Sequence, residues 1–378
     1  MDTITYKDSN KMQDYATHPM FRYFGKLPPT LVSMLMDEYC PRDAAVLDLM
    51  CGSGTTLVEA YLRRLPAVGV DVNPLSTLVS QVKTTKIEAE AMAGALAAFR
   101  AFAAAPPAGA YTYFRPSTKN LNYWFTGDAQ NKLSAIRYFI ENSRLWAAGQ
   151  DRTDTEVRNL LLVTYAGIIR RVSNASPRTG RIFRCAQDSS CDAFEAMASK
   201  LQSNILLIQR LPASDLKYKV LLSDARNTGL SADSFDFILN HPPYFALYKY
   251  SSDVLRFELE WLGFDRSRIA RQEITDGFKT TDEELLNQYV CDMSDVFKEM
   301  RRLMRDGAKA CVVVSDSKLR EKQLPVVDRL VEAVAASGLC VDSHMLRPVS
   351  FAQASYHRSA KPNIRTNEDH VLILKPAD

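Results

Sequence analysis

Short apolar runs alternate with stretches of helical periodicity along most of this chain. The runs that predict strands are 45–50, 67–71, 219–223, 235–239, 309–315, 339–346 and 370–375. The stretches that predict helices between them are 55–64, 75–84, 284–305 and 322–337. This alternation is typical of a doubly wound α/β protein with a mostly parallel, seven-stranded sheet. The last run is compatible with a reversed hairpin at one end of that sheet.

A long insertion, residues 86–213, separates the second predicted strand from the third. It opens with an alanine-rich stretch at 89–105 that favours helix. After a break at residues 106–109, helical patterns resume near 128–147, 154–172 and 190–211. We interpret the insertion as a helical subdomain, which divides the chain into 1–85, 86–213 and 214–378.

The composition is that of an ordinary globular protein, with 46% hydrophobic and 24% charged residues in 378. A formal net charge of +3 is too small to indicate nucleic-acid binding by itself. The seven cysteines are scattered without a Cys-x-x-Cys pair, so neither a disulfide framework nor a zinc site is expected. No apolar signal segment and no membrane-spanning run is evident, which makes the cytoplasm the expected location and a membrane partner unexpected.

A glycine loop follows the first predicted strand. The strand ends at Asp48, the chain turns through Gly52 and Gly54, and a helix is expected from Thr55. Such a loop brings backbone N–H groups close to a ligand at the start of a helix. The third glycine of a dinucleotide-binding loop is replaced by Leu57, and a carboxylate precedes the loop. This favours a nucleoside ligand without a pyrophosphate, whose ammonium group Asp48 or its neighbours could receive.

Two more acids end the next two predicted strands. Asp71 stands where a carboxylate can accept from both ribose hydroxyls of a nucleotide-like ligand. Asp224 could accept a hydrogen bond from an adenine amino group. The alternative is that these acids only cap strands and turns.

A diproline turn leaves the buried strand at 235–239 by its carboxyl end, where ligands bind in open α/β sheets. The turn reads Asn240-His241-Pro242-Pro243-Tyr244. Two prolines stiffen it, so the carbonyls of His241 and Pro242 can be aimed at an amine, while Tyr244 or Phe245 stacks on a ring. The alternative is a purely structural turn with a buried tyrosine.

Together these motifs resemble those of the DNA amino-methyltransferases, the N6-adenine and N4-cytosine family. Residues 48–56 resemble the family's cofactor loop, and residues 241–244 resemble its catalytic (Asp/Asn/Ser)-Pro-Pro-(Tyr/Phe/Trp) motif. Residues 18–19 and 24–29 resemble the segment that closes over the methionine end of the cofactor, and residues 248–263 resemble the segment after the catalytic motif in some cytosine-type members. The resemblance covers about two thirds of the chain, 15–85 and 215–376, and leaves the insertion unexplained.

The resemblance implies a class I methyltransferase fold, S-adenosylmethionine as cofactor, and methyl transfer to the exocyclic amine of a flipped base in duplex DNA, in a restriction–modification or related system. The residues it assigns to the cofactor are Lys26, Asp48, Met50, Cys51, Gly52, Ser53, Gly54, Thr55, Thr56, Asp71, Val72, Asn73, Asp224 and Ala225. Those it assigns to catalysis are Asn240, His241, Pro242, Pro243 and Tyr244. No metal is expected.

His241 departs from the family motif, because it stands where Asp, Asn or Ser is usual. A neutral imidazole can accept one hydrogen bond, and a protonated one cannot. The target base, cytosine or adenine, therefore stays open. Asn240 is an alternative source of the side-chain acceptor, although its spacing from the prolines differs.

Contacts with DNA phosphates are expected from lysine and arginine side chains. The densest basic cluster, residues 170–184, includes Arg171, Arg178 and Arg181, which we expect, with Phe245, to contact the substrate. A solvated surface loop is the alternative. A second basic stretch, 347–368, joins the last two predicted strands and is expected to be functional or mobile. Three other functions remain open: methylation of an RNA base, a catalytically lapsed nucleic-acid-binding protein, and methylation of a protein amine or a small molecule.

Overall fold

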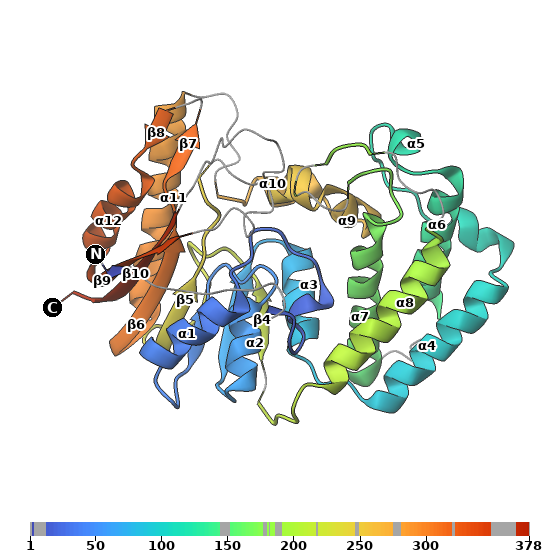
Figure 1. The fold of residues 1–378 in the computed structure, drawn as a ribbon, viewed down its shortest axis with the longest axis horizontal. Helices are drawn as coiled ribbons and strands as arrows, with labels where there is room; N and C mark the ends of the chain where they lie inside the picture. Colours follow the sequence, from blue (N-terminus) through green and yellow to red (C-terminus); the bar gives the residue numbers. More distant parts are fainter. Residues whose placement is uncertain are drawn as a thin grey trace.

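The computed structural model describes residues 2–3, 13–143, 152–176, 180, 182–185, 191–216, 218–245, 249–274, 281–319, 322–348 and 368–377. One mixed sheet runs through the molecule, in the order β1-β9-β10-β6-β5-β2-β3-β4 (Figure 1). The seven predicted strands are all present, as β2 (Val46–Asp48), β3 (Ala67–Asp71), β4 (Lys219–Leu222), β5 (Phe235–Asn240), β6 (Met304–Val314), β9 (Leu339–Pro348) and β10 (Glu368–Pro376). The two-residue β1 (Asp2–Thr3) pairs with β9 at the end of the sheet.

The strand directions confirm the predicted class I methyltransferase architecture. Every neighbouring pair from β4 to β6 is parallel, whereas β10 runs antiparallel to both β6 and β9. The expected reversed hairpin is therefore β9–β10, and Arg347 lies in its first strand. Residues 349–367, which make up most of the predicted basic connection, lie outside the described residues.

Helices cover both faces of the sheet, as a doubly wound fold requires. Phe237 and Leu239 of β5 pack on the side of α1 (Pro29–Tyr39) and α2 (Thr55–Leu62). Ile238, between them, packs on the side of α11 (Asp282–Leu303) and α12 (Val326–Ala336). Because β5 is buried on both faces, its three consecutive positions 237–239 are all apolar rather than alternating with polar residues. A separate small hairpin is formed by β7 (Ser317–Leu319) and β8 (Lys322–Leu324).

The insertion is helical, as predicted, and lies on the β4 side of the sheet (Figure 1). Its elements are α4 (Ala89–Ala104), a 3-10 turn (Ala108–Thr112), α5 (Leu121–Trp124), α6 (Gly127–Asn142), α7 (Arg152–Ile169) and α8 (Ala193–Gln209). It packs against α3 (Pro74–Lys83), the helix that follows β3.

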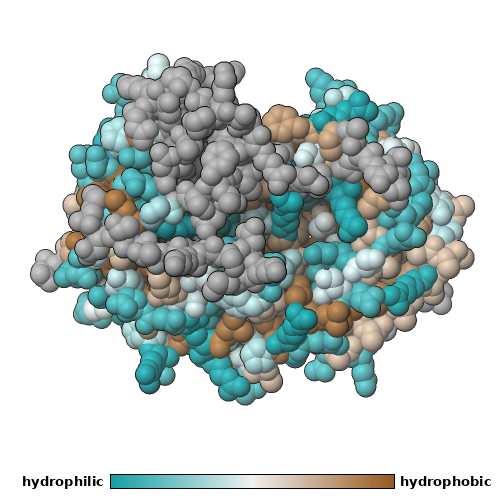
Figure 2. All heavy atoms as spheres, viewed as in Figure 1, coloured by the Kyte–Doolittle hydropathy of each residue, from teal (hydrophilic) through white to brown (hydrophobic). Residues whose placement is uncertain are grey.

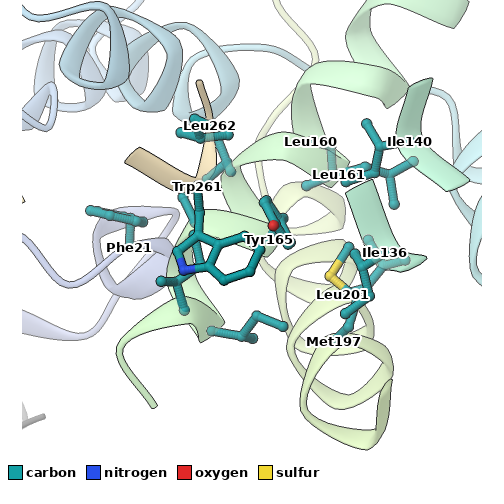
Figure 3. Close-up of a cluster of buried hydrophobic side chains, with 14 of the residues drawn as sticks. Phe21, Ile136, Ile140, Leu160, Leu161, Tyr165, Met197, Leu201, Trp261 and Leu262 are labelled. Atoms are coloured by element: carbon teal, nitrogen blue, oxygen red, sulfur yellow. The ribbon is translucent and has the colours of Figure 1, made fainter. Parts of the chain in front are cut away.

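The core of the insertion extends beyond it in sequence. Trp261, at the end of α9 (Arg256–Trp261), is fully buried beside Tyr165 of α7, and Phe21 joins the same cluster (Figure 3). The Trp261 ring lies 5.5 Å from that of Phe125. The insertion is thus held to segments from both other parts of the chain, while the exact division into domains stays a prediction.

Hydrophilic residues predominate over much of the face seen in Figure 2, with apolar residues in smaller patches. In the part of the chain that the structure describes, no helix is long and apolar enough to cross a membrane.

Candidate active site

A pocket lies where β2, β3, β4 and β5 end. Because β2 pairs in parallel with both β3 and β5, the loops that follow these strands emerge at one edge of the sheet. The residues that line the pocket are Tyr23, Gly25, Lys26, Leu27, Asp48, Leu49, Met50, Cys51, Gly52, Ser53, Thr55, Thr56, Asp71, Val72, Asn73, Asp224, Ala225, His241, Pro243, Tyr250, Gln272, Glu273 and Ile274. The glycine loop and the diproline turn therefore share one pocket.

The glycine loop has a backbone that requires glycine at two positions. Gly52 and Gly54 have φ angles of +49° and +76°, in the left-handed region that other residues rarely adopt. A Cβ atom at Gly54 would lie 2.8 Å from the Ser80 hydroxyl oxygen and 3.0 Å from the Ser80 Cα. Gly54 supports the start of α2 and is not itself among the residues that line the pocket.

Two carboxyl groups form the polar part of the pocket. Asp48 is only 4% exposed and accepts from the Met50 N–H at 3.2 Å, and burial raises its pKa to about 7. Asp71 accepts from the N–H groups of Gly52 and Asn73 at 2.9 and 2.8 Å, and burial raises its pKa to about 6. A ligand that offers positive charge or hydroxyl donors would stabilise the ionised form of both carboxyl groups.

Asp224 also lines the pocket, but it already has a partner. Its carboxylate forms an ion pair with Arg226 at 2.7 Å. Burial works to raise the pKa of Asp224, and the hydrogen bonds from Arg226 outweigh it, so that the pKa is lowered. The group is ionised and held in place, with part of its accepting capacity in use.

The N-terminal segment closes one side of the pocket, as expected from its resemblance. Tyr23 stacks on Tyr250 with ring centroids 5.4 Å apart, and both line the pocket. Lys26 Nζ donates to the His18 carbonyl at 3.2 Å, and burial lowers the pKa of Lys26. The His18 imidazole is in turn bonded to the buried Glu59 of α2 at 2.9 Å. These contacts fix the segment on the helix that starts at the glycine loop.

Unused polar groups in the pocket fit a polar nucleoside ligand. The Ser53 hydroxyl and the Asn73 side-chain nitrogen are buried, and within the described residues neither has a hydrogen-bond partner. Both residues line the pocket. Buried donors without partners are costly unless a ligand or water satisfies them, so the lining suits a ligand rich in acceptors.

The diproline turn presents His241 and Pro243 to the pocket. Burial lowers the pKa of His241 to about 3, with a smaller contribution from the positive charge of Arg347. The imidazole is therefore neutral near pH 7 and can accept a hydrogen bond. The ring of Tyr244 stands edge-on to that of His241, with centroids 5.0 Å apart. The departure from the family motif thus keeps an acceptor at this position.

Other predicted residues lie away from the pocket surface. Asn240 is fully buried, and neither polar atom of its side chain has a partner within the described part of the chain. Phe245 is 1% exposed and packs in the core against Tyr289, so it has no free face for stacking on a substrate ring. Arg171 is exposed in the turn that follows α7, and Arg178 and Arg181 lie outside the described residues.

Eight pocket residues were not among those assigned to the cofactor, to catalysis or to the substrate: Tyr23, Gly25, Leu27, Leu49, Tyr250, Gln272, Glu273 and Ile274. Tyr250 belongs to the segment already likened to the family, and it begins a π-helical turn (Tyr250–Val254), a feature often found at functional sites. Glu273 accepts from the N–H and the hydroxyl of Ser251, at 3.0 and 2.9 Å. Residues 272–274 carry no local motif, and only tertiary packing brings them to the pocket.

The strand order, with the glycine loop and the diproline turn at one edge, is that of the class I methyltransferase fold. No protein-family model matches the chain. The type II methyltransferase M.MvaI of Kocuria varians is 22% identical over 249 residues, which cover 60% of this chain and 53% of that protein. The type II methyltransferase M.MjaII of Methanocaldococcus jannaschii is 30% identical over 80 residues, 21% of this chain and 15% of that protein.

The chain therefore spans about half the length of the first relative and less of the second. Among solved structures, a SAM-dependent methyltransferase from Methanosarcina mazei is 10% identical with a TM-score of 0.36, covering 91% of this chain and 97% of that one. A TehB-like SAM-dependent methyltransferase from Corynebacterium glutamicum is 9% identical with a TM-score of 0.33, covering 91% and 86%. The two sequence relatives confirm the resemblance to S-adenosylmethionine-dependent DNA methyltransferases, and with it the cofactor expected for that class.

Proposed function

We propose that this chain transfers a methyl group from S-adenosylmethionine to the exocyclic amine of a base in DNA, N4 of cytosine or N6 of adenine, in a restriction–modification or related system. The observation that carries the proposal is the shared pocket, in which Asp48 and Gly52 lie with His241 and Pro243. A methyl donor and its acceptor must be held together in a fixed orientation, and paired strands β2 and β5 bring the two loops together.

We assign the cofactor to the side of the pocket formed by β2, β3 and β4. Asp48 would receive the ammonium group and Asp71 the ribose hydroxyls, while Lys26 offers a cation for the ligand carboxylate. Asp71 keeps free lone pairs for this, because each carboxylate oxygen can accept more than one hydrogen bond. When bound, S-adenosylmethionine supplies an activated methyl group on a positively charged sulfur.

We assign the target amine to the diproline turn. The Pro243 carbonyl already accepts from Tyr289 at 3.0 Å, which leaves the carbonyls of His241 and Pro242 as candidate acceptors for the amine N–H groups. The neutral His241 ring is a third. Hydrogen bonds from the N–H groups of the target amine to these acceptors orient the lone pair of its nitrogen. The ring of Tyr244 supports the base by stacking. This is catalysis by orientation and fixed dipoles.

A base inside a duplex cannot reach this turn, so the proposal requires base flipping. Phosphate contacts would supply much of the affinity for DNA. The exposed Arg171 is a described candidate for such a contact.

Methyl transfer from labelled S-adenosylmethionine to unmethylated duplex DNA tests the proposal. Nucleoside mass spectrometry of DNA from cells that express the protein should show N4-methylcytosine or N6-methyladenine. Asp71→Ala should raise the Kd for the cofactor. At low cofactor concentration this variant should therefore transfer little methyl, and it serves as the negative control.

Transfer RNA and ribosomal RNA, assayed in parallel, distinguish the alternatives. If RNA were labelled and DNA were not, the substrate would be an RNA base and not a base in DNA. A folded protein that bound no S-adenosylmethionine by calorimetry would be a lapsed scaffold, and the proposed enzyme would have to be abandoned.

A further inference from the structure

The diproline turn and the residue that follows it are held from outside by hydrogen bonds with three elements, α11, β7 and β10. Tyr289 of α11 donates to the Pro243 carbonyl at 3.0 Å, and the Ser317 hydroxyl donates to the Phe245 carbonyl at 2.9 Å. The Tyr244 hydroxyl donates to Asp369 Oδ1 at 2.7 Å. The first two bonds fix the backbone. The third fixes a side chain that would touch the substrate.

Asp369 is itself part of a buried ion pair. It stands directly opposite Arg347 on the paired strands β9 and β10, and Arg347 Nη1 lies 2.5 Å from Asp369 Oδ2. The two side chains are 4% and 6% exposed. Burial raises the pKa of Asp369, and the charge of Arg347 and the hydrogen bond from Tyr244 offset that effect only in part. Since buried ion pairs rarely stabilise more than apolar residues of the same size, this pair calls for another explanation.

The charges around His241 complete the arrangement. Arg347 of β9 acts on the imidazole directly and, with burial, lowers its pKa. Asp369 of β10 lies behind, bonded to both Arg347 and Tyr244. Asp48 of β2 lines the same pocket. Asp369 thus binds the hydroxyl of Tyr244, whose ring stands edge-on to that of His241, and Arg347 acts on His241 through its charge.

We propose that Arg347 and Asp369 are positioning residues for the turn 241–244, in which Asp369 fixes the ring of Tyr244 through its hydroxyl and Arg347 holds Asp369 and places a fixed positive charge beside His241. This inference rests on the proposed amino-methyl transfer. It gives the last two strands of the sheet a part in catalysis, although Arg347 and Asp369 lie more than a hundred residues after the turn in sequence.

A double-mutant cycle tests the action of Asp369 through Tyr244. Tyr244→Phe removes only the hydroxyl, and Asp369→Asn keeps an oxygen acceptor without the charge. Each should lower kcat about 10- to 100-fold with an unchanged Kd for S-adenosylmethionine, because the ring loses its fixed orientation. The double variant should be no worse than the more damaged single variant. Wild-type kcat in folded Asp369→Asn, or losses that multiply in the double variant, would overturn this half.

The titration of His241 tests the role of Arg347 without requiring any turnover. By NMR, the imidazole of the wild type should stay neutral down to about pH 4, and Arg347→Met should move its titration upward, toward the ordinary range. Arg347→Lys, which keeps the charge, should restore the wild-type titration. If the pKa of His241 were the same in Arg347→Met as in the wild type, the proposed role of Arg347 would be refuted, whatever the substrate of the protein is.

The matched control is a second ion pair on the same two strands. Lys375 Nζ of β10 lies 3.1 Å from Asp342 Oδ1 of β9, far along the strands from the turn. Lys375→Met and Asp342→Asn should leave kcat and the titration of His241 unchanged. If Asp369→Asn does not fold, the neutral double variant Arg347→Met/Asp369→Asn replaces it, with the same expected loss of kcat. If the wild type methylates no nucleic acid, the proposed function fails, while the titration still decides the inference about Arg347.

Discussion

At the scale of the residue, the protonation states of a few buried groups control what the pocket can bind. Asp48 and Asp71 have raised pKa values, near 7 and 6, because burial disfavours their charge. Burial also disfavours the charged form of His241, which is a cation, so the pKa of His241 is lowered to about 3. The pocket is therefore less charged without a ligand than its sequence indicates.

Cofactor affinity should depend on pH through Asp48. A ligand ammonium group favours the ionised carboxylate, so binding must displace a proton when the pH lies below about 7. We expect the Kd for S-adenosylmethionine to rise as the pH falls from 8 to 6, by up to about ten-fold per pH unit. Calorimetry in buffers of different ionisation enthalpy measures the released proton. Asp48→Asn should bind weakly at every pH and release none, and an unchanged proton release in that variant would exclude Asp48 as the source.

His241→Asn should retain activity within about ten-fold at pH 7.5, because an amide oxygen replaces one neutral acceptor by another. Steady-state kcat with duplex DNA is the measurement, and His241→Leu, which accepts nothing, is the control. Complete loss in His241→Asn would mean that the imidazole has a role beyond accepting a hydrogen bond.

At the scale of the element, the start of α2 depends on one glycine. A side chain at Gly54 would meet Ser80 in a conformation that already disfavours it. We expect Gly54→Ala to lower the free energy of unfolding by about 1–3 kcal/mol and to weaken cofactor binding. Chemical denaturation and calorimetry measure the two effects.

Gly94→Ala is the matched control for that change. Gly94 lies inside α4, where an added Cβ would meet no atom of the described residues within 4 Å. Alanine there should raise the free energy of unfolding by about 0.5–1 kcal/mol. If Gly54→Ala and Gly94→Ala changed the free energy of unfolding in the same direction, the strain assigned to the glycine loop would be wrong.

At the scale of the whole molecule, the insertion and the sheet should unfold together. Trp261, the last residue of α9, is fully buried against the insertion helices, and Figure 3 shows it beside Tyr165. Trp261→Ala should lower the free energy of unfolding by about 3–5 kcal/mol and keep a single transition. Circular dichroism and a fluorescent label on α4 should report the same midpoint. Two separate transitions would show that the insertion is an independent domain.

The resemblance of motifs located most of the pocket, because both motifs are local in sequence. Thirteen of the fourteen residues assigned to the cofactor line the pocket, from Lys26 to Ala225, and the exception, Gly54, supports the loop from behind. Residues without a motif were missed. Tyr23, Gln272 and Glu273 reach the pocket only because their segments fold over the edge of the sheet.

What the sequence determined by itself is the alternation of strands and helices, the two loops and the chemistry that each offers. Runs of apolar residues and glycine or proline at turns act over a few residues, so they can be recognised without a structure. The tertiary structure alone decided which side chains are buried and beside which charges. It placed Phe245 in the core and Arg347 with Asp369 behind Tyr244, and it made His241 neutral. Burial and electrostatic partners depend on residues far apart in the chain, and no local pattern encodes them.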